Sequence, residues 1–132
     1  MTRAKLANDA LYSPLLGISA NRNIASTDLG GTIYPVYNST ANDLTLTLTQ
    51  AISATLPRGF EFAVGYFYTN NKIKVALTGV RVMIAGEGQK GGASSTVTVR
   101  PSEVGQIIAF KRIDSASNGD YWIVTGAVEV VS

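Results

Sequence analysis

Residues 43–50 read DLTLTLTQ, so three leucines alternate with three threonines without interruption. In an extended strand, successive side chains point to opposite faces, which puts all three leucines on one face and all three threonines on the other. The leucine face is expected to meet a hydrophobic core. The threonine side chains, Thr45, Thr47 and Thr49, are then either exposed to solvent or a contact face for another subunit. Charged side chains usually protect a strand from unwanted pairing, and this stretch has none inside its ends, which favours the contact face.

Eight other stretches have the composition of short strands and are separated by residues typical of turns. Asparagine at 70 and 71 suits a tight hairpin turn, and the Asn118-Gly119 pair is a strong hairpin signal. Pro101 ends the strand before it because proline cannot donate to a ladder. The expected strands are Thr32–Tyr37, Asp43–Gln50, Phe60–Tyr68, Lys72–Leu77, Val80–Ala85, Ser95–Arg100, Gln106–Ile113, Tyr121–Thr125 and Ala127–Val131.

This succession of strands, with no sustained helical period, predicts an all-β fold. We expect one antiparallel β-sandwich, or a jelly-roll-like barrel, of about eight or nine short strands over residues 32–132. Residues 1–31 show no sustained period and form an extended N-terminal segment. That segment either packs across the sandwich or acts as an arm that docks on a neighbouring subunit or a host surface. The candidate contact residues of such an arm are Leu11, Tyr12, Leu15, Leu16 and Ile18.

The composition favours a protein that binds other proteins over one that binds nucleic acid or membrane. Charged residues make up 15% of the 132 residues, against about 25% in a typical soluble domain. The 11 basic residues are scattered and form no run, whereas phosphate backbones are bound by concentrated positive patches. No apolar stretch approaches the roughly 18 residues of a membrane span, and no signal peptide is recognisable. We therefore expect a protein made in a cytoplasm, or assembled there into something larger.

Catalytic, metal-binding and cofactor-binding residues are not predicted. The chain has no cysteine and no histidine, which removes thiolate chemistry, disulfides and the commonest general base. Nine carboxylates are present, and a glycosidase needs only two of them about 5–9 Å apart, so a glycan hydrolase stays as a third alternative. No calcium-loop spacing and no GxSxG motif occurs. The expectation is a protein that is not an enzyme.

The pattern GxGxxG occurs once, at residues 86–91. In dinucleotide-binding folds this pattern follows a strand and opens a helix. Here it leads into ASSTVTVRP, which has the alternation of another strand. We expect a flexible loop between two antiparallel strands and no nucleotide site.

Ten aromatic residues lie mostly in the expected strands. They either fill the core and finish its rim or, where exposed, serve a carbohydrate site or a protein interface, which both use tyrosine and tryptophan. These residues are Tyr34, Tyr37, Phe60, Phe62, Tyr66, Phe67, Tyr68, Phe110, Tyr121 and Trp122.

From about residue 26 the chain resembles a small β-sandwich module of tailed-bacteriophage virion proteins. The resemblance covers about 100 of the 132 residues. It is carried by STDLGGTIYPVYNSTANDLTLTLT, by ATLPRGFEFAVGYF with its leucine-proline-x-glycine step, by KIKVALTGVRVMIAGEG, and by the closing VGQIIAFKRIDSASNGDYWIVTGAV. The N-terminal 25 residues have no counterpart in the module.

The resemblance implies a small, often trimeric sandwich found in capsid decoration proteins, head fibres and tail-fibre tips, with no shared catalytic residues. The length suits a separate decoration (cement) protein that binds the outside of a phage head, because the chain lacks the repetitive shaft of a tail fibre. Its expected partners are copies of itself and the major capsid protein or other virion proteins, and its expected place is the virion. The alternative is a receptor-binding module of a head or tail fibre that holds cell-surface glycans.

Overall fold

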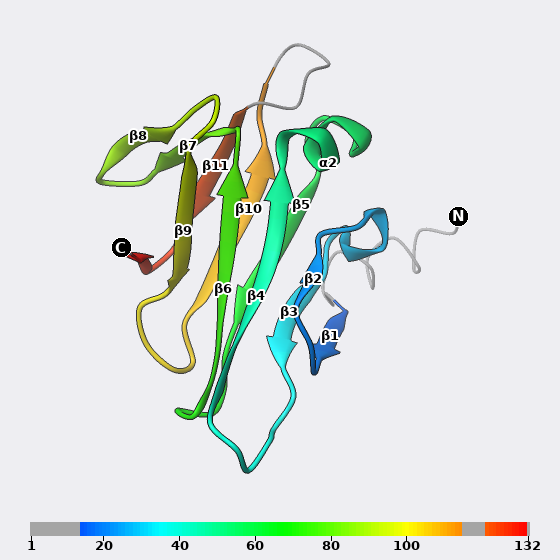
Figure 1. The fold of residues 1–132 in the computed structure, drawn as a ribbon, viewed down its shortest axis with the longest axis vertical. Helices are drawn as coiled ribbons and strands as arrows, with labels where there is room; N and C mark the ends of the chain where they lie inside the picture. Colours follow the sequence, from blue (N-terminus) through cyan, green and yellow to red (C-terminus); the bar gives the residue numbers. More distant parts are fainter. Residues whose placement is uncertain (1–13, 115–120, 132) are drawn as a thin grey trace, which may run out of the picture.

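The computed structural model describes residues 14–114 and 121–131, which form two β-sheets on either side of one hydrophobic core (Figure 1). Sheet A has seven strands, in the order β1 (Leu15–Ile18), β3 (Thr32–Pro35), β5 (Glu61–Gly65), β10 (Ile107–Arg112), β11 (Tyr121–Thr125), β7 (Arg81–Ile84) and β8 (Gly88–Gly91). Sheet B has five, in the order β12 (Val128–Val131), β9 (Thr96–Pro101), β6 (Asn71–Thr78), β4 (Asn42–Thr49) and β2 (Arg22–Asn23). Two short helices, η1 (Ser26–Asp28) and α2 (Gln50–Thr55), lie between strands.

The all-β prediction is confirmed, and each expected strand corresponds to an observed one. The expectation of purely antiparallel sheets is wrong. Strands β4 and β6 run parallel in sheet B, and β1, β3 and β5 run parallel in sheet A. The reason is that β5, which separates β4 from β6 in the sequence, lies in the other sheet, so the chain returns to sheet B in the direction of β4. The predicted turn at Asn70 and Asn71 likewise joins strands of different sheets, not a hairpin within one sheet.

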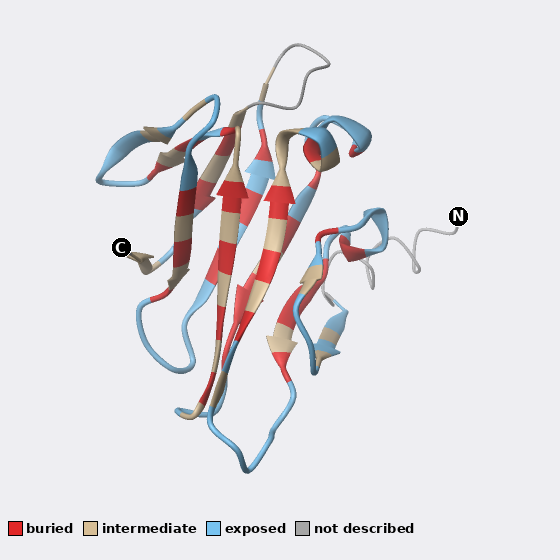
Figure 2. Ribbon diagram, in the orientation of Figure 1, coloured by how far each residue is buried: buried red, intermediate tan, exposed pale blue. Residues whose placement is uncertain are grey.

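Alternation along the strands builds the core as expected. The bands of burial along β4, β6 and β9 in Figure 2 show this alternation directly. Leu44, Leu46 and Leu48 are buried, while the threonines between them are half-buried. From sheet A, Phe62 and Phe110 stack in parallel with ring centroids 4.7 Å apart. The large aromatic side chains of sheet A and the aliphatic ones of sheet B therefore fill the space between the sheets.

Helix α2 was not expected from the sequence. Thr49 is its N-cap, and the Thr49 hydroxyl accepts a 3.2 Å hydrogen bond from the Ile52 backbone N–H. The helix ends before Leu56, and Pro57 follows. Because only six residues are helical, the segment is too short to show a helical period in the sequence. Neither of the two short helices in the described residues is long and apolar enough to cross a membrane.

A buried arginine anchors α2 to sheet A. The Arg112 guanidinium forms a two-point ion pair with Asp114, with nitrogen–oxygen distances of 2.6 and 2.9 Å. The same guanidinium donates to the backbone oxygens of Ser53 and Leu56 at the end of the helix. Arginine can serve both partners because its planar fork carries five donors. The helix is thus fixed to β10 through polar contacts inside the protein.

Residues 15–31 take part in both sheets. Strand β1 pairs with β3, and β2 pairs with β4. Between them and β3, the buried Asp28 accepts two hydrogen bonds from Arg22, at 2.7 and 2.9 Å, and a third from the Ala25 N–H. The hydrogen bond to Asp28 raises the pKa of Arg22 above its ordinary value. This part of the expected N-terminal arm is held in the fold by pairing and by a buried carboxylate.

The GxGxxG stretch is a β-hairpin and not the flexible loop we expected. Residues Gly88–Gly91 form β8, which pairs antiparallel with β7. Gly86 has a φ of 84° and Gly91 a φ of 80°, a region that side chains other than glycine rarely adopt. A Cβ added at Gly91 would also lie 2.6 Å from the Val80 backbone oxygen. The glycines therefore shape a tight ribbon.

Candidate functional site

The three threonines of β4 lie on the outer face of sheet B and are continued by neighbouring strands. Thr47 is beside Ala76 of β6, which is beside Thr98 of β9. One row further along, Thr49, Thr78 and Thr96 lie side by side, and the last two hydroxyls are 2.9 Å apart. We call these seven residues the threonine face: Thr45, Thr47, Thr49, Ala76, Thr78, Thr96 and Thr98.

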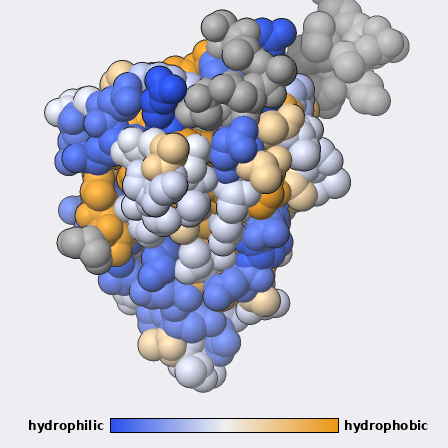
Figure 3. Space-filling model, turned by 45° about the horizontal axis from the view of Figure 1, so that its top comes forward, coloured by the Kyte–Doolittle hydropathy of each residue, from blue (hydrophilic) through white to orange (hydrophobic). Residues whose placement is uncertain are grey.

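Charged residues border the threonine face on one side. Arg100 of β9 and Glu129 of β12 form an ion pair of 3.1 Å next to Lys74, which is beside Thr45. The hydrogen bond to Glu129 raises the pKa of Arg100 above its ordinary value. Figure 3 shows one view of the surface, in which residues of intermediate hydropathy separate scattered hydrophilic and hydrophobic groups. The outer surface of sheet B thus has an uncharged half and an ion-paired half.

The residues proposed for the N-terminal arm are only partly available for contact. Leu15 is 66% exposed. Leu16 and Ile18 pack against the core, and the Leu16 side chain covers Gly31 so closely that a Cβ there would lie 2.6 Å from it. Leu11 and Tyr12 lie outside the described residues. Of the three that the structure describes, Leu15 is the one that points to solvent.

Exposed aromatic side chains gather where β3 and β5 end, at the lower end of the molecule in Figure 1. Tyr37 and Tyr68 are 61% and 44% exposed, and their rings meet edge to face with centroids 4.9 Å apart. Tyr34 and Phe67 form a second pair at 5.5 Å. These aromatic residues are visible in the sequence, but their pairing is not, because their loops are about 30 residues apart.

A buried asparagine holds the two loops together. The Asn71 side chain is fully buried; its amide oxygen accepts from the Asn38 N–H at 3.0 Å. Its amide nitrogen donates to the Thr40 backbone oxygen at 3.3 Å and to the Asn42 side-chain oxygen at 2.9 Å. Asn70 adds a bond from its side chain to the Asn38 backbone oxygen. We call this end, comprising Tyr37, Asn38, Tyr68, Asn70 and Asn71, the tip.

A pocket of about 310 Å³ opens beside the tip, lined by Tyr66, Thr69, Lys72, Glu103 and Val104. Thr69 follows the exposed Tyr68 directly in the chain, so the pocket continues the surface of the tip. Lys72 and Glu103 give it one charge of each sign. Burial is the main reason that the pKa of the Tyr66 phenol is raised above its ordinary value. A low-dielectric wall with a few polar groups is typical of small-ligand pockets.

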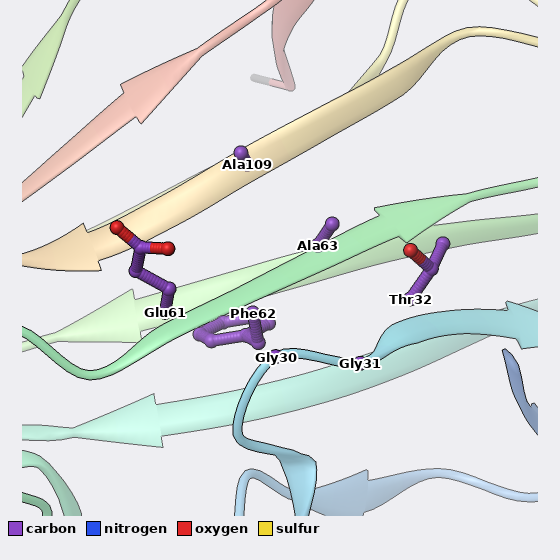
Figure 4. A pocket seen from close by; sticks show the side chains of 7 residues that line it. All are labelled: Gly30, Gly31, Thr32, Glu61, Phe62, Ala63 and Ala109. Atoms are coloured by element: carbon purple, nitrogen blue, oxygen red, sulfur yellow. The ribbon is translucent and has the colours of Figure 1, made fainter. Parts of the chain in front are cut away.

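A second pocket, of about 140 Å³, lies on the outer face of sheet A between β3, β5 and β10 (Figure 4). Its walls are mostly small, with Gly30, Gly31, Ala63 and Ala109 among them. Its one carboxylate, Glu61, forms a 3.1 Å ion pair with Lys111. The pocket therefore offers little chemistry to a ligand.

Within residues 14–114 and 121–131, no group of three or more acidic, histidine or cysteine side chains is placed to hold a metal ion. Glu61 and Glu129 lie on the outer faces of sheets A and B, and each pairs with a basic residue of the next strand. Comparison with protein-family models, with curated proteins and with solved structures gave no match.

Proposed function

We propose that this chain is a non-enzymatic structural protein of a tailed-phage virion, a decoration protein that binds the outside of the head and stabilises it as a trimer. Two things support the proposal: the resemblance to a virion module, which begins at about residue 26 and covers about 100 of the 132 residues, and the threonine face. The jelly-roll-like form of the sandwich belongs to the same proposal. It is supported by connections that pass between the sheets, such as β4 to β5 and β5 to β6.

The threonine face is the observation that carries the proposal. The outer face of a sheet whose other face packs on the core normally carries polar and charged side chains. Here seven uncharged side chains on three adjacent strands form a plane of methyl groups and hydroxyls. The five strands of sheet B have 28 residues, so at about 4.8 Å between strands and about 3.3 Å per residue the whole outer face covers roughly 440 Å². That is about half of the area that each partner buries in an interface of standard size, about 800 Å², so the contact would also include neighbouring loops.

The capsid contact is proposed for the N-terminal segment. Leu15 exposes a large apolar side chain where this segment enters sheet A. Residues 1–13 add Leu11 and Tyr12. Binding through an apolar segment would leave the threonine face for contacts between copies of the chain.

The test combines solution mass with cosedimentation on expanded, DNA-free heads of the virus. The wild-type chain should have three times the mass of the 13.9 kDa subunit and should sediment with the heads. Thr47→Lys should give monomers that fold. The matched control is Thr125→Lys, which places the same charge on the outer face of sheet A. A monomeric wild type that stays in the supernatant would overturn the proposal.

The alternative function, a glycan-binding module, is favoured by one specific observation, the exposed aromatic pair of the tip.

A further inference from the structure

The two tyrosines of the tip form an exposed aromatic pair. Tyr37 and Tyr68 are 61% and 44% exposed, and their rings meet edge to face. An aromatic ring has a negative face and a positive edge. The free face of each ring therefore offers an apolar, negatively polarised surface that attracts the C–H groups of a ligand.

The loops that carry these rings are held in place before any ligand binds. The side-chain amide of Asn71 forms three hydrogen bonds to the loop of residues 38–42. The Asn42 N–H also bonds the Asn70 backbone oxygen at 3.0 Å. Fixing the loops in advance removes much of the ordering entropy that binding would otherwise lose. Such rigid loops on a sheet scaffold are where binding residues usually lie.

Hydrogen-bonding groups remain available next to the rings. In the part of the chain that the structure describes, the Asn38 amide nitrogen and the Asn70 amide oxygen have no hydrogen-bond partner. They offer, respectively, two donors and an acceptor. Thr69 follows Tyr68 in the chain and lines the pocket, where it adds a hydroxyl. Neutral donors and acceptors beside an aromatic surface match a ligand that has hydroxyl groups and an apolar C–H face.

The charges around the tip argue against an anionic ligand. The adjoining pocket has one lysine and one glutamate, Lys72 and Glu103. A phosphate or nucleic-acid site would instead concentrate positive charge. The volume of about 310 Å³ falls at the lower end of the range for small-ligand sites, and it would hold about one or two sugar rings.

We propose that the tip is a binding site for a neutral oligosaccharide. One sugar ring stacks its C–H face on Tyr37 and Tyr68, the Asn38 and Asn70 amides bond its hydroxyls, and the next ring enters the pocket at Thr69. The site does not depend on the decoration role, because none of the tip residues belongs to the threonine face or to the candidate arm residues. A virion protein with this site would hold a surface glycan while remaining bound to the head.

The experiment uses the full-length protein and a printed array of neutral oligosaccharides of hexoses, N-acetylhexosamines and deoxyhexoses. The strongest binder is then titrated by saturation-transfer NMR. Tyr37→Ala and Tyr68→Ala should each weaken binding about tenfold, because each removes one stacking surface. Tyr37→Phe keeps the ring and should retain most of the affinity. Tyr121→Ala, at the opposite end of sheet A, is the control and should bind as the wild type does.

Three results would overturn the proposal. They are an array without saturable binding, binding that survives both alanine variants, and alanine variants that lose cosedimentation with heads while no sugar binds. The last would make the tip a protein contact. Cosedimentation on the same samples separates the two proposals, since Thr47→Lys should alter assembly and leave sugar binding unchanged.

Discussion

The Trp122 indole N–H donates a 2.7 Å hydrogen bond to the Ser53 hydroxyl, joining β11 of sheet A to helix α2. Both residues are fully buried. Ser53 lies 69 positions earlier in the chain, so this bond forms only when α2 has docked on sheet A. The core therefore depends on the small hydroxyl of Ser53, which lies in a helix that was not expected from the sequence.

Replacing Ser53 by alanine should lower the free energy of unfolding by about 1–3 kcal/mol, because the buried indole N–H loses its acceptor. Urea denaturation followed by tryptophan fluorescence measures the change. Ser102→Ala, at an exposed turn position, is the control and should stay within about 0.5 kcal/mol of the wild type. Equal midpoints for the two variants would show that the bond contributes nothing.

Arg112→Ala should destabilise the fold by about 3–5 kcal/mol, because the buried Asp114 carboxylate loses its opposing charge and the helix end loses its donor. The side chains of both residues are at most 5% exposed. The contrasting variant is Lys111→Ala. Lys111 pairs with Glu61 in solvent, and removing such a pair changes stability by only about 0–1 kcal/mol. Similar losses in both variants would contradict a special role for the buried pair.

Gly91→Ala should be destabilised more than Gly86→Ala. Both positions have a positive φ, so alanine is strained at each by about 1–2 kcal/mol. At Gly91 the new Cβ would also press on the Val80 oxygen, whereas at Gly86 nothing lies within 4 Å. Thermal unfolding by circular dichroism would rank them. A lower melting temperature for Gly86→Ala than for Gly91→Ala would refute the close approach at Gly91.

The raised pKa of Tyr66 should make the fold less stable at high pH. Burial raises its pKa in the folded state above the ordinary value of 10.0, so the unfolded chain releases this proton first. The stabilisation that Tyr66 contributes is complete below pH 10, and it is lost as the pH rises through the pKa of Tyr66 in the folded state. Tyr66→Phe should flatten the decline of unfolding free energy measured between pH 9 and 11. An unchanged slope would mean that Tyr66 ionises alike in both states.

Removing residues 1–13 should abolish binding to heads while the melting temperature stays unchanged. The cut comes before Pro14, so β1, β2 and their partners are kept. A cut after residue 25 would test less, since it would also remove the buried Ile24 and the Arg22 partner of Asp28. Heads that retain the shortened chain would show that Leu11 and Tyr12 are not needed for the contact.

The strands were predictable because each carries its own alternation. Segments without it were missed: β1 and β2 are short, β8 is GQKG, and α2 has six helical residues. The parallel pairing of β4 with β6 was also beyond the sequence, since alternation is the same for either direction of the neighbouring strand.

The tip was partly within reach of the sequence. Asn71 begins a run in which every second residue, Ile73, Val75 and Leu77, is buried. That period places Asn71 on the inner face, where an amide must find partners. The identity of those partners, in a loop some 30 positions earlier, depends on the closed fold.

The order of strands also bears on how the molecule acquires and loses its structure. Among the described strands, only β7 with β8 and β10 with β11 are consecutive neighbours within a sheet, and sheet B contains no such pair. Nearly every ladder joins distant parts of the chain, which slows folding because long loops must close first. It also means that no strand of sheet B can peel away with its sequence neighbour. Once formed, a domain with this strand order would resist fraying and come apart as one unit.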